Sequence, residues 1–97
     1  MKRKQLMKEI QDSLKSEMRE AILDGWDWMD FEQCFGDATV HVKLYEVRLA
    51  YGKYILDEDI WIEHLNRRHE SPLLEKAVKE ILPDWFQIKM EVNRQIA

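Results

Sequence analysis

Apolar and polar residues alternate along the stretch ATVHVKLYEVRL, residues 38–49, near the middle of the chain. Val40, Val42 and Leu44 occupy even positions, and His41 and Lys43 fall between them. β-Branched and aromatic residues are frequent, and neither Gly nor Pro interrupts the run, which is typical of a strand with one buried face. The pattern predicts a central β-strand, and we expect the rest of the chain to be organised around it.

The alternation changes phase inside this strand. Apolar residues are even-numbered up to Leu44 but odd-numbered afterwards, at Val47, Leu49 and Tyr51. Two explanations remain open: a β-bulge near residues 45 and 46 turns the second half over, or the second half is covered on both faces. We favour the bulge, because it lets both halves of the strand face the same core.

A strand is also predicted before the central one. Met29, Phe31 and Phe35 share one parity, which indicates a strand over residues 29–35. Gly36 and Asp37 follow it and suit a two-residue hairpin turn. The two strands are therefore expected to form an antiparallel hairpin.

A third strand is predicted over residues 58–65, where Ile60 and Ile62 alternate with Trp61 and Glu63. It should follow a turn at residues 51–53 and a connection that carries the acidic residues 57–59. The three strands would then form an antiparallel meander.

Residues 4–23 predict an amphipathic helix, because apolar residues recur there every three or four positions. Gly25 is well placed to end it in a left-handed cap. The apolar stripe either covers one face of the sheet, which we favour, or forms a dimer or partner surface. In the second case the sheet would need another cover.

The C-terminal third predicts one or two further helices. Ser71 followed by Pro72 is typical of a helix start, with Ser71 as the N-cap, and Pro83 should end this helix at Leu82. Residues 84–97 suit either a helix or a fourth strand, and we favour the helix because they contain many good helix formers. The chain is predicted to be an α+β protein: an N-terminal helix, a three-stranded antiparallel meander, and then one or two helices packed on the sheet.

Length and composition predict a single small globular domain over residues 1–97. Hydrophobic residues make up 45% of the chain, enough for one modest core. Cys34 is the single cysteine, so an internal disulfide is excluded and a reducing compartment is expected. The sequence shows neither an apolar run long enough to span a membrane nor the apolar core of a signal peptide. We therefore expect a cytoplasmic protein without membrane association.

The charge is mildly acidic overall, at −4, and unevenly distributed. Residues 1–19 carry six basic and three acidic side chains, whereas residues 20–37 carry six acidic ones and no basic one. Overall acidity argues against nucleic acid as the main partner. A weaker alternative is a nucleic-acid-associated accessory protein, which would use four basic side chains at one end of the meander: Arg48, Lys53, Arg67 and Arg68.

Catalytic and metal-binding motifs are not found in the sequence. His and Cys residues do not occur in the close pairs typical of structural zinc sites, so we expect neither a metal nor a cofactor. The carboxylates of Asp57, Glu58 and Asp59 offer a remote enzymatic alternative, although adjacent acids are more often a solvated turn. We expect the protein not to be an enzyme.

The segment DGWDWMDFEQCFGD, residues 24–37, combines acids with aromatic rings. Trp26 and Trp28 are either anchors of a protein interface, or at least one of them packs under the first helix; a small-molecule stacking site is a third possibility. Tyr45 and Trp61 are expected on the sheet face away from the helices. The sequence therefore favours a small protein-binding or adaptor domain that self-associates as a homodimer through an apolar sheet face and this acidic-aromatic segment. The acids of the segment would also favour a basic protein partner.

Overall fold

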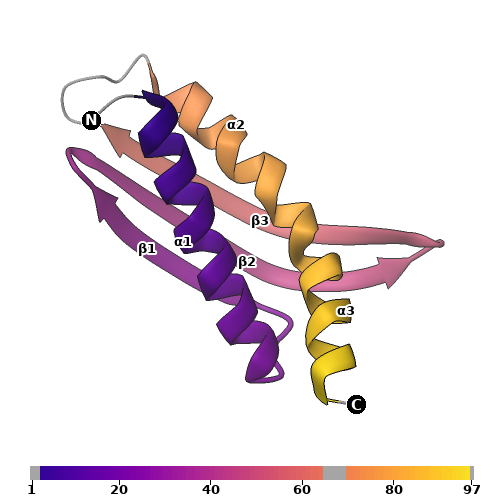
Figure 1. Cartoon of the computed structure of the whole chain (residues 1–97). Helices are drawn as coiled ribbons and strands as arrows, with labels where there is room; N and C mark the ends of the chain where they lie inside the picture. The colour runs from indigo at the N-terminus through magenta and orange to yellow at the C-terminus, as the bar shows by residue number, and fades with distance from the viewer. Residues whose placement is uncertain (1–2, 65–69, 97) are drawn as a thin grey trace.

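The computed structural model describes residues 3–64 and 70–96, which form one antiparallel sheet with helices packed on one of its faces (Figure 1). In chain order the elements are α1 (Arg3–Leu23), β1 (Met29–Phe35), β2 (Ala38–Ala50), β3 (Lys53–His64), α2 (Ser71–Ile81), the short 3-10 helix η2 (Leu82–Asp84) and α3 (Trp85–Ile96). The strands follow one another in the order β1-β2-β3. The predicted α+β meander is confirmed.

The β1–β2 hairpin turns where the sequence predicted it. Gly36 has φ of +63°, a left-handed conformation that glycine adopts without steric cost, and Phe35 pairs with Ala38 across the turn. This register places Phe31 opposite Val42, and both side chains face the helices and are buried. The turn therefore sets which residues of the two strands enter the core.

A β-bulge interrupts the β2–β3 ladder between Leu44 and Glu46, as the change of parity predicted. Tyr45 has no partner in the ladder, and beyond it Val47 pairs with Leu56. The extra residue turns the second half of β2 over, so Val47 packs against the same core as Leu44. The backbone N–H of Val47 donates to the carbonyl of Asp27 at 3.1 Å, which ties the bulged region to the connection before β1.

Helix α1 ends in a Schellman cap at Gly25, whose φ is +81°. The Gly25 N–H donates to the carbonyl of Ile22, and the Trp26 N–H donates to that of Ala21, both at 3.0 Å. The predicted left-handed cap is confirmed. Because the cap reverses the chain direction, it delivers the segment from Trp26 to the start of β1.

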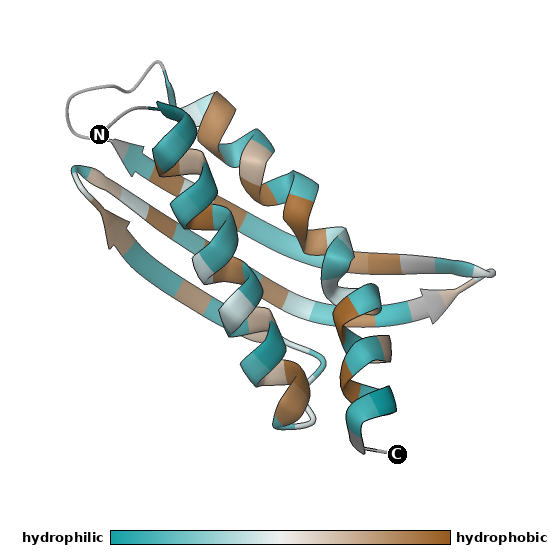
Figure 2. Cartoon of the chain, in the orientation of Figure 1, coloured by the Kyte–Doolittle hydropathy of each residue, from teal (hydrophilic) through white to brown (hydrophobic). Residues whose placement is uncertain are grey.

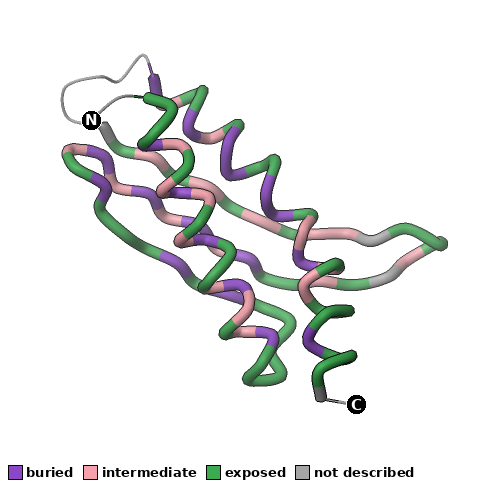
Figure 3. The backbone as a smooth tube through the Cα atoms, in the orientation of Figure 1, coloured by how far each residue is buried: buried purple, intermediate pink, exposed green. Residues whose placement is uncertain are grey.

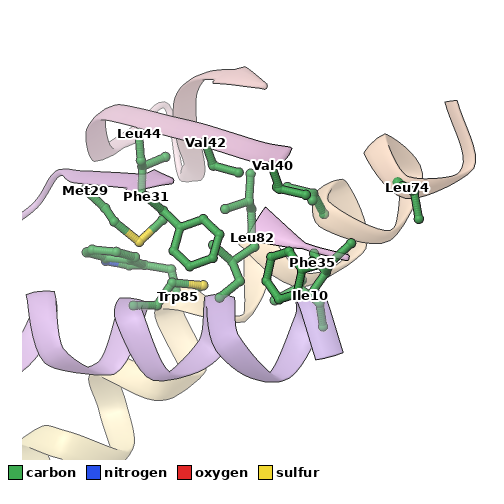
Figure 4. Close-up of a cluster of buried hydrophobic side chains, with 14 of the residues drawn as sticks. Ile10, Met29, Phe31, Phe35, Val40, Val42, Leu44, Leu74, Leu82 and Trp85 are labelled. Carbon is green, nitrogen blue, oxygen red and sulfur yellow. The ribbon is translucent and has the colours of Figure 1, made fainter. Parts of the chain in front are cut away.

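The core lies between the sheet and the helices (Figures 2 and 4). From α1 it receives the predicted stripe, with five buried side chains: Leu6, Ile10, Leu14, Met18 and Ile22. Trp85, at the start of α3, is completely buried and lies beside Met29 and Phe31 in the close-up (Figure 4). The α1 stripe therefore covers the sheet and is not a free surface for a partner.

Two expected boundaries, the start of β3 and the start of α2, differ from the structure. Strand β3 begins at Lys53, so the expected connection around residue 57 is part of the strand. Helix α2 has Glu70 at its N-cap position and Ser71 as its first helical residue, so the prediction of Ser71 as the cap is wrong. An ion pair between Arg3 and Glu70, 3.9 Å from Nε to Oε1, joins this helix start to α1.

Pro83 does not end the helical path at Leu82. Helix α2 ends at Ile81, η2 contains the proline, and α3 follows at once. The proline can occupy the first turn of a helix, where its missing N–H is not needed, so the chain changes direction without leaving helical geometry. The preference for a helix in the C-terminal segment is confirmed, and the alternative of a fourth strand is wrong.

Beyond the pair Val47–Leu56, which still packs against the core, the β2–β3 hairpin extends past the helices as an arm, residues 48–55 (Figures 1 and 3). The molecule measures 45 × 28 × 18 Å, and its radius of gyration of 14.1 Å exceeds the roughly 13 Å of a compact chain of this length. Tyr51, at the turn of the arm, is fully exposed. The helices therefore cover only part of the two longer strands.

Candidate functional site

The sheet face opposite the helices carries no other element of the described chain, and we call its central part the open face. Strand alternation places ten side chains on it: Asp30, Glu32, Cys34, Thr39, His41, Lys43, Tyr45, Asp59, Trp61 and Glu63. Their neighbours along each strand face the helices, and most of them are apolar and buried or half-buried. Because successive side chains of a strand point to opposite faces of the sheet, every second residue of these strands lies on the open face.

The register arranges nine of these side chains in three rows across the strands. From the α1 C-terminal end towards the β1–β2 turn the rows are Asp30–Lys43–Asp59, Glu32–His41–Trp61 and Cys34–Thr39–Glu63. Directly opposite residues on one face lie close enough for their side chains to interact. The rows thus bring carboxylates from the two outer strands to both sides of the central strand.

Tyr45 and Trp61 are exposed on the open face, with 55% and 46% of their surface accessible, as the sequence predicted. The Tyr45 hydroxyl donates a hydrogen bond to Oδ2 of Asp59 at 2.7 Å. This hydrogen bond raises the pKa of the Tyr45 phenol, and partial desolvation and the negative charges of Asp59 and Asp30 raise it further. The bulge thus places the Tyr45 ring on the open face, where the hydrogen bond to Asp59 restrains it.

Trp26 and Trp28 are both half exposed, at 50% and 49%, so the expectation that one of them packs under α1 is wrong. They contact each other, with ring centroids 5.3 Å apart. The Schellman cap directs the chain away from α1 at this point, which keeps both rings out of the core. Trp28 also lines a hollow of about 270 Å³ together with Tyr45 and Lys43.

His41 connects the rows at the centre of the open face. Its Nε2 lies 2.9 Å from Oδ1 of Asp30, and its ring lies 4.9 Å from the Trp61 ring, centroid to centroid. The imidazole is thus fixed from two sides, by a carboxylate on β1 and an indole on β3. The two rings are tilted by 48° to each other, so the imidazole also restrains the indole.

A second hollow, of about 290 Å³, lies further along the open face. Its lining comes from all three strands: Glu32, Thr39, His41, Trp61 and Glu63. Sequence reasoning did not identify Glu32, His41 or Glu63 as site residues. Parity alone places them on the open face, but only the register shows that they meet around one hollow.

A hollow of about 300 Å³ also lies between α1 and α3. Lys15 and Asp84 in its lining form an ion pair, with Nζ 3.5 Å from Oδ2, and Arg19 at its rim donates a hydrogen bond to Gln95 at 2.8 Å. Both basic side chains of its lining are therefore paired within the protein, and the described lining contains no aromatic ring. The open face, with its exposed aromatic rings, is the stronger candidate.

The carboxylates of residues 57–59 do not form a cluster. Asp57 and Asp59 lie on the open side of β3, whereas Glu58 points towards the helices, opposite Leu44. An extended strand sends neighbouring side chains to opposite faces, so the three groups cannot act together on one substrate. Burial raises the pKa of Glu58, and the positive charge of Lys79 on α2 partly offsets this.

Replacing Glu58 with glutamine is expected to stabilise the protein at neutral pH. Since the pKa of Glu58 is higher in the folded state than its ordinary value of 4.5, its stabilising contribution is present below that value and is lost as pH rises through the raised one. The gain of Glu58→Gln at pH 7 should reach at most about 0.5 kcal/mol, because the side chain is only partly desolvated. Urea denaturation at neutral pH and near pH 4 measures it. An equal gain at both pH values, or a similar gain for Asp57→Asn, would contradict this account.

The basic side chains of the nucleic-acid alternative are not assembled by the described part of the chain. Arg48 and Lys53 lie on the arm, and two acids, Glu46 and Asp57, pair with each other beside them. The predictions for Arg67 and Arg68 lie outside the described residues. Within residues 3–64 and 70–96, the structure contains no group of three or more potential metal-binding side chains.

Comparison of the chain with protein-family models, with curated proteins and with solved structures found no match. Among the described residues, no helix is both long and apolar enough to cross a membrane. The geometry of the open face is therefore the basis for a proposed function.

Proposed function

We propose that the chain is a small, non-catalytic protein-binding module whose partner docks on the open face of the sheet. The observation that carries this proposal is the exposure of Trp28, Tyr45 and Trp61 on or beside that one face. Large aromatic side chains that remain half exposed are typical anchors of protein interfaces, because they bury much surface for little lost side-chain entropy. The carboxylates around them would form the polar rim.

A second copy of the chain is the alternative occupant. The open face carries four carboxylates, of Asp30, Glu32, Asp59 and Glu63, against the single basic side chain of Lys43. Two such faces packed against each other would bring like charges together, which costs free energy on desolvation. Charge therefore favours a different, basic protein over a homodimer, and the solution mass distinguishes the two.

The test compares a face variant with a variant of the helical side. Tyr45→Ala/Trp61→Ala removes two exposed rings from the open face, and Leu73→Ala/Met90→Ala removes two exposed apolar side chains from α2 and α3. Each chain is immobilised and exposed to an extract of the source cells. We expect the wild-type chain and the helical variant to capture the same protein. The face variant should capture much less of that protein.

Light scattering on the purified chain completes this test. A monomer that captures a different protein through the open face agrees with the proposal. A stable dimer that dissociates in the Tyr45→Ala/Trp61→Ala variant would show that a second copy of the chain occupies the open face. Capture that survives in the face variant but fails in the helical variant would place the binding surface on the helices and overturn the proposal.

A further inference from the structure

The carboxylates of the open face are not equivalent. Oδ1 of Asp30 lies 2.9 Å from Nε2 of His41, within hydrogen-bond distance, and Oδ2 of Asp59 accepts a hydrogen bond from Tyr45 at 2.7 Å. Both also flank Lys43 in their row. Asp30 and Asp59 therefore already interact with side chains of the protein itself.

Glu32 and Glu63 differ from them. Among the described residues neither side chain has a hydrogen-bond or ion-pair partner, and both line the hollow of about 290 Å³ on the open face. Glu32 comes from β1 and Glu63 from β3, so they lie on opposite sides of the central strand. The indole of Trp61 forms part of the wall, held by its contact with His41 at 4.9 Å.

We propose that this hollow binds the guanidinium group of an arginine from the basic segment of a partner protein. The inference rests on the proposed function, of which it specifies the partner chemistry. Glu32 and Glu63 would accept hydrogen bonds from the guanidinium edges, and the exposed face of Trp61 would stack on its plane. Arginine is the side chain that combines a fixed set of donors with a flat cation suited to an aromatic face.

Other cations fit this arrangement less well. A lysine ammonium is a point charge that cannot stack on the indole and reach two carboxylates from separate strands with the same planar geometry. A hard metal ion such as calcium requires six to eight oxygen ligands, more than the two carboxylates and the Thr39 hydroxyl of the lining supply. The hollow therefore selects for arginine by shape as well as by charge.

The binding test uses a short capped peptide of arginine, glycine and serine, with citrulline replacing arginine in the matched control peptide. Citrulline keeps the planar group but not the charge. The indole N–H signals of Trp61 and Trp85, assigned with Trp→Phe variants, report binding by NMR. We expect the arginine peptide to shift the Trp61 signal and to leave that of the buried Trp85 unchanged, and the citrulline peptide to shift neither.

The charge test compares two double variants with the same change of net charge. Glu32→Gln/Glu63→Gln neutralises the two carboxylates of the hollow, and Glu20→Gln/Glu80→Gln neutralises two exposed carboxylates on α1 and α2. The first should weaken peptide binding about tenfold, as expected for the loss of charge-assisted hydrogen bonds, and the second less than about twofold.

Equal weakening by both double variants, binding of the citrulline peptide, or an unmoved Trp61 signal would overturn the arginine site. So would a Trp61 signal that shifts with the concentration of the chain alone, because a second copy would then occupy the face. If Tyr45→Ala/Trp61→Ala abolishes partner capture but Glu32→Gln/Glu63→Gln preserves it, the proposed function stands and only this inference fails.

Discussion

Replacing Trp85 with alanine should lower the free energy of unfolding by about 3–5 kcal/mol, the usual cost of truncating a fully buried tryptophan. The side chain has no accessible surface and lies between the helices and the β1–β2 hairpin. Chains of this size have a total stability of roughly 5–15 kcal/mol, so the variant would be marginally stable or unfolded. Urea denaturation followed by circular dichroism measures the loss.

Trp85→Phe keeps this prediction testable if the alanine variant does not fold. The indole Nε1 is buried and has no hydrogen-bond partner among the described residues, so phenylalanine removes an unsatisfied donor while it retains a ring. We expect a loss of about 1–2 kcal/mol, from the smaller volume alone. A phenylalanine variant as unstable as the alanine variant would contradict this prediction, because it would mean that the indole N–H has a stabilising partner in the core.

Leu14→Ala should cost about 3–5 kcal/mol, because Leu14 lies in the middle of the α1 stripe and is completely buried against the sheet. Alanine is a good helix former, so the loss would report packing and not helix propensity. The same denaturation experiment applies.

Ser16→Ala is the matched control for the same helix, since Ser16 is exposed. Its effect should stay within about 0.5 kcal/mol. If Leu14→Ala cost no more than Ser16→Ala, α1 could not be covering the sheet, and its stripe would have to be a surface for a partner after all.

The fold was predictable from the sequence wherever apolar periodicity was strong. The stripe of α1 predicts a helix, the parity of β1 predicts a strand, and the change of phase at Tyr45 predicts a bulge. The structure contains all three. The helical C-terminal segment was also predicted, because its composition outweighed a short alternating run.

The start of β3 was missed because periodicity weakens where the helices no longer cover the sheet. On the arm both sides of the strand are partly solvated, so alternation has little energetic basis there, and the acids at residues 57–59 are more typical of a solvated turn than of a strand. The exposure of both Trp26 and Trp28 was not predictable either. Their exposure depends on the direction of the chain after the cap at Gly25. The apolar character of the segment does not predict that direction.

The candidate site was predictable only in part, for a geometric reason. Parity sufficed to place Tyr45 and Trp61 on the face away from the helices. The meeting of Glu32 and Glu63 around one hollow depends on two registers, one fixed by the turn at Gly36 and the other by the β2–β3 hairpin. A shift of two residues in either register would keep every side chain on its own face but would separate the two glutamates, and the apolar alternation does not exclude such a shift.

The bulge at Tyr45 has a consequence for how this surface could change during evolution. Leu44 pairs with Glu58 and Glu46 with Asp57, so loss of Tyr45 alone would leave an uninterrupted ladder. Val47 would still face the core, and no buried residue would be turned outward. A lineage could therefore gain or lose the ring at this position by a single codon insertion or deletion, and so acquire or abandon a partner without rebuilding the protein beneath it.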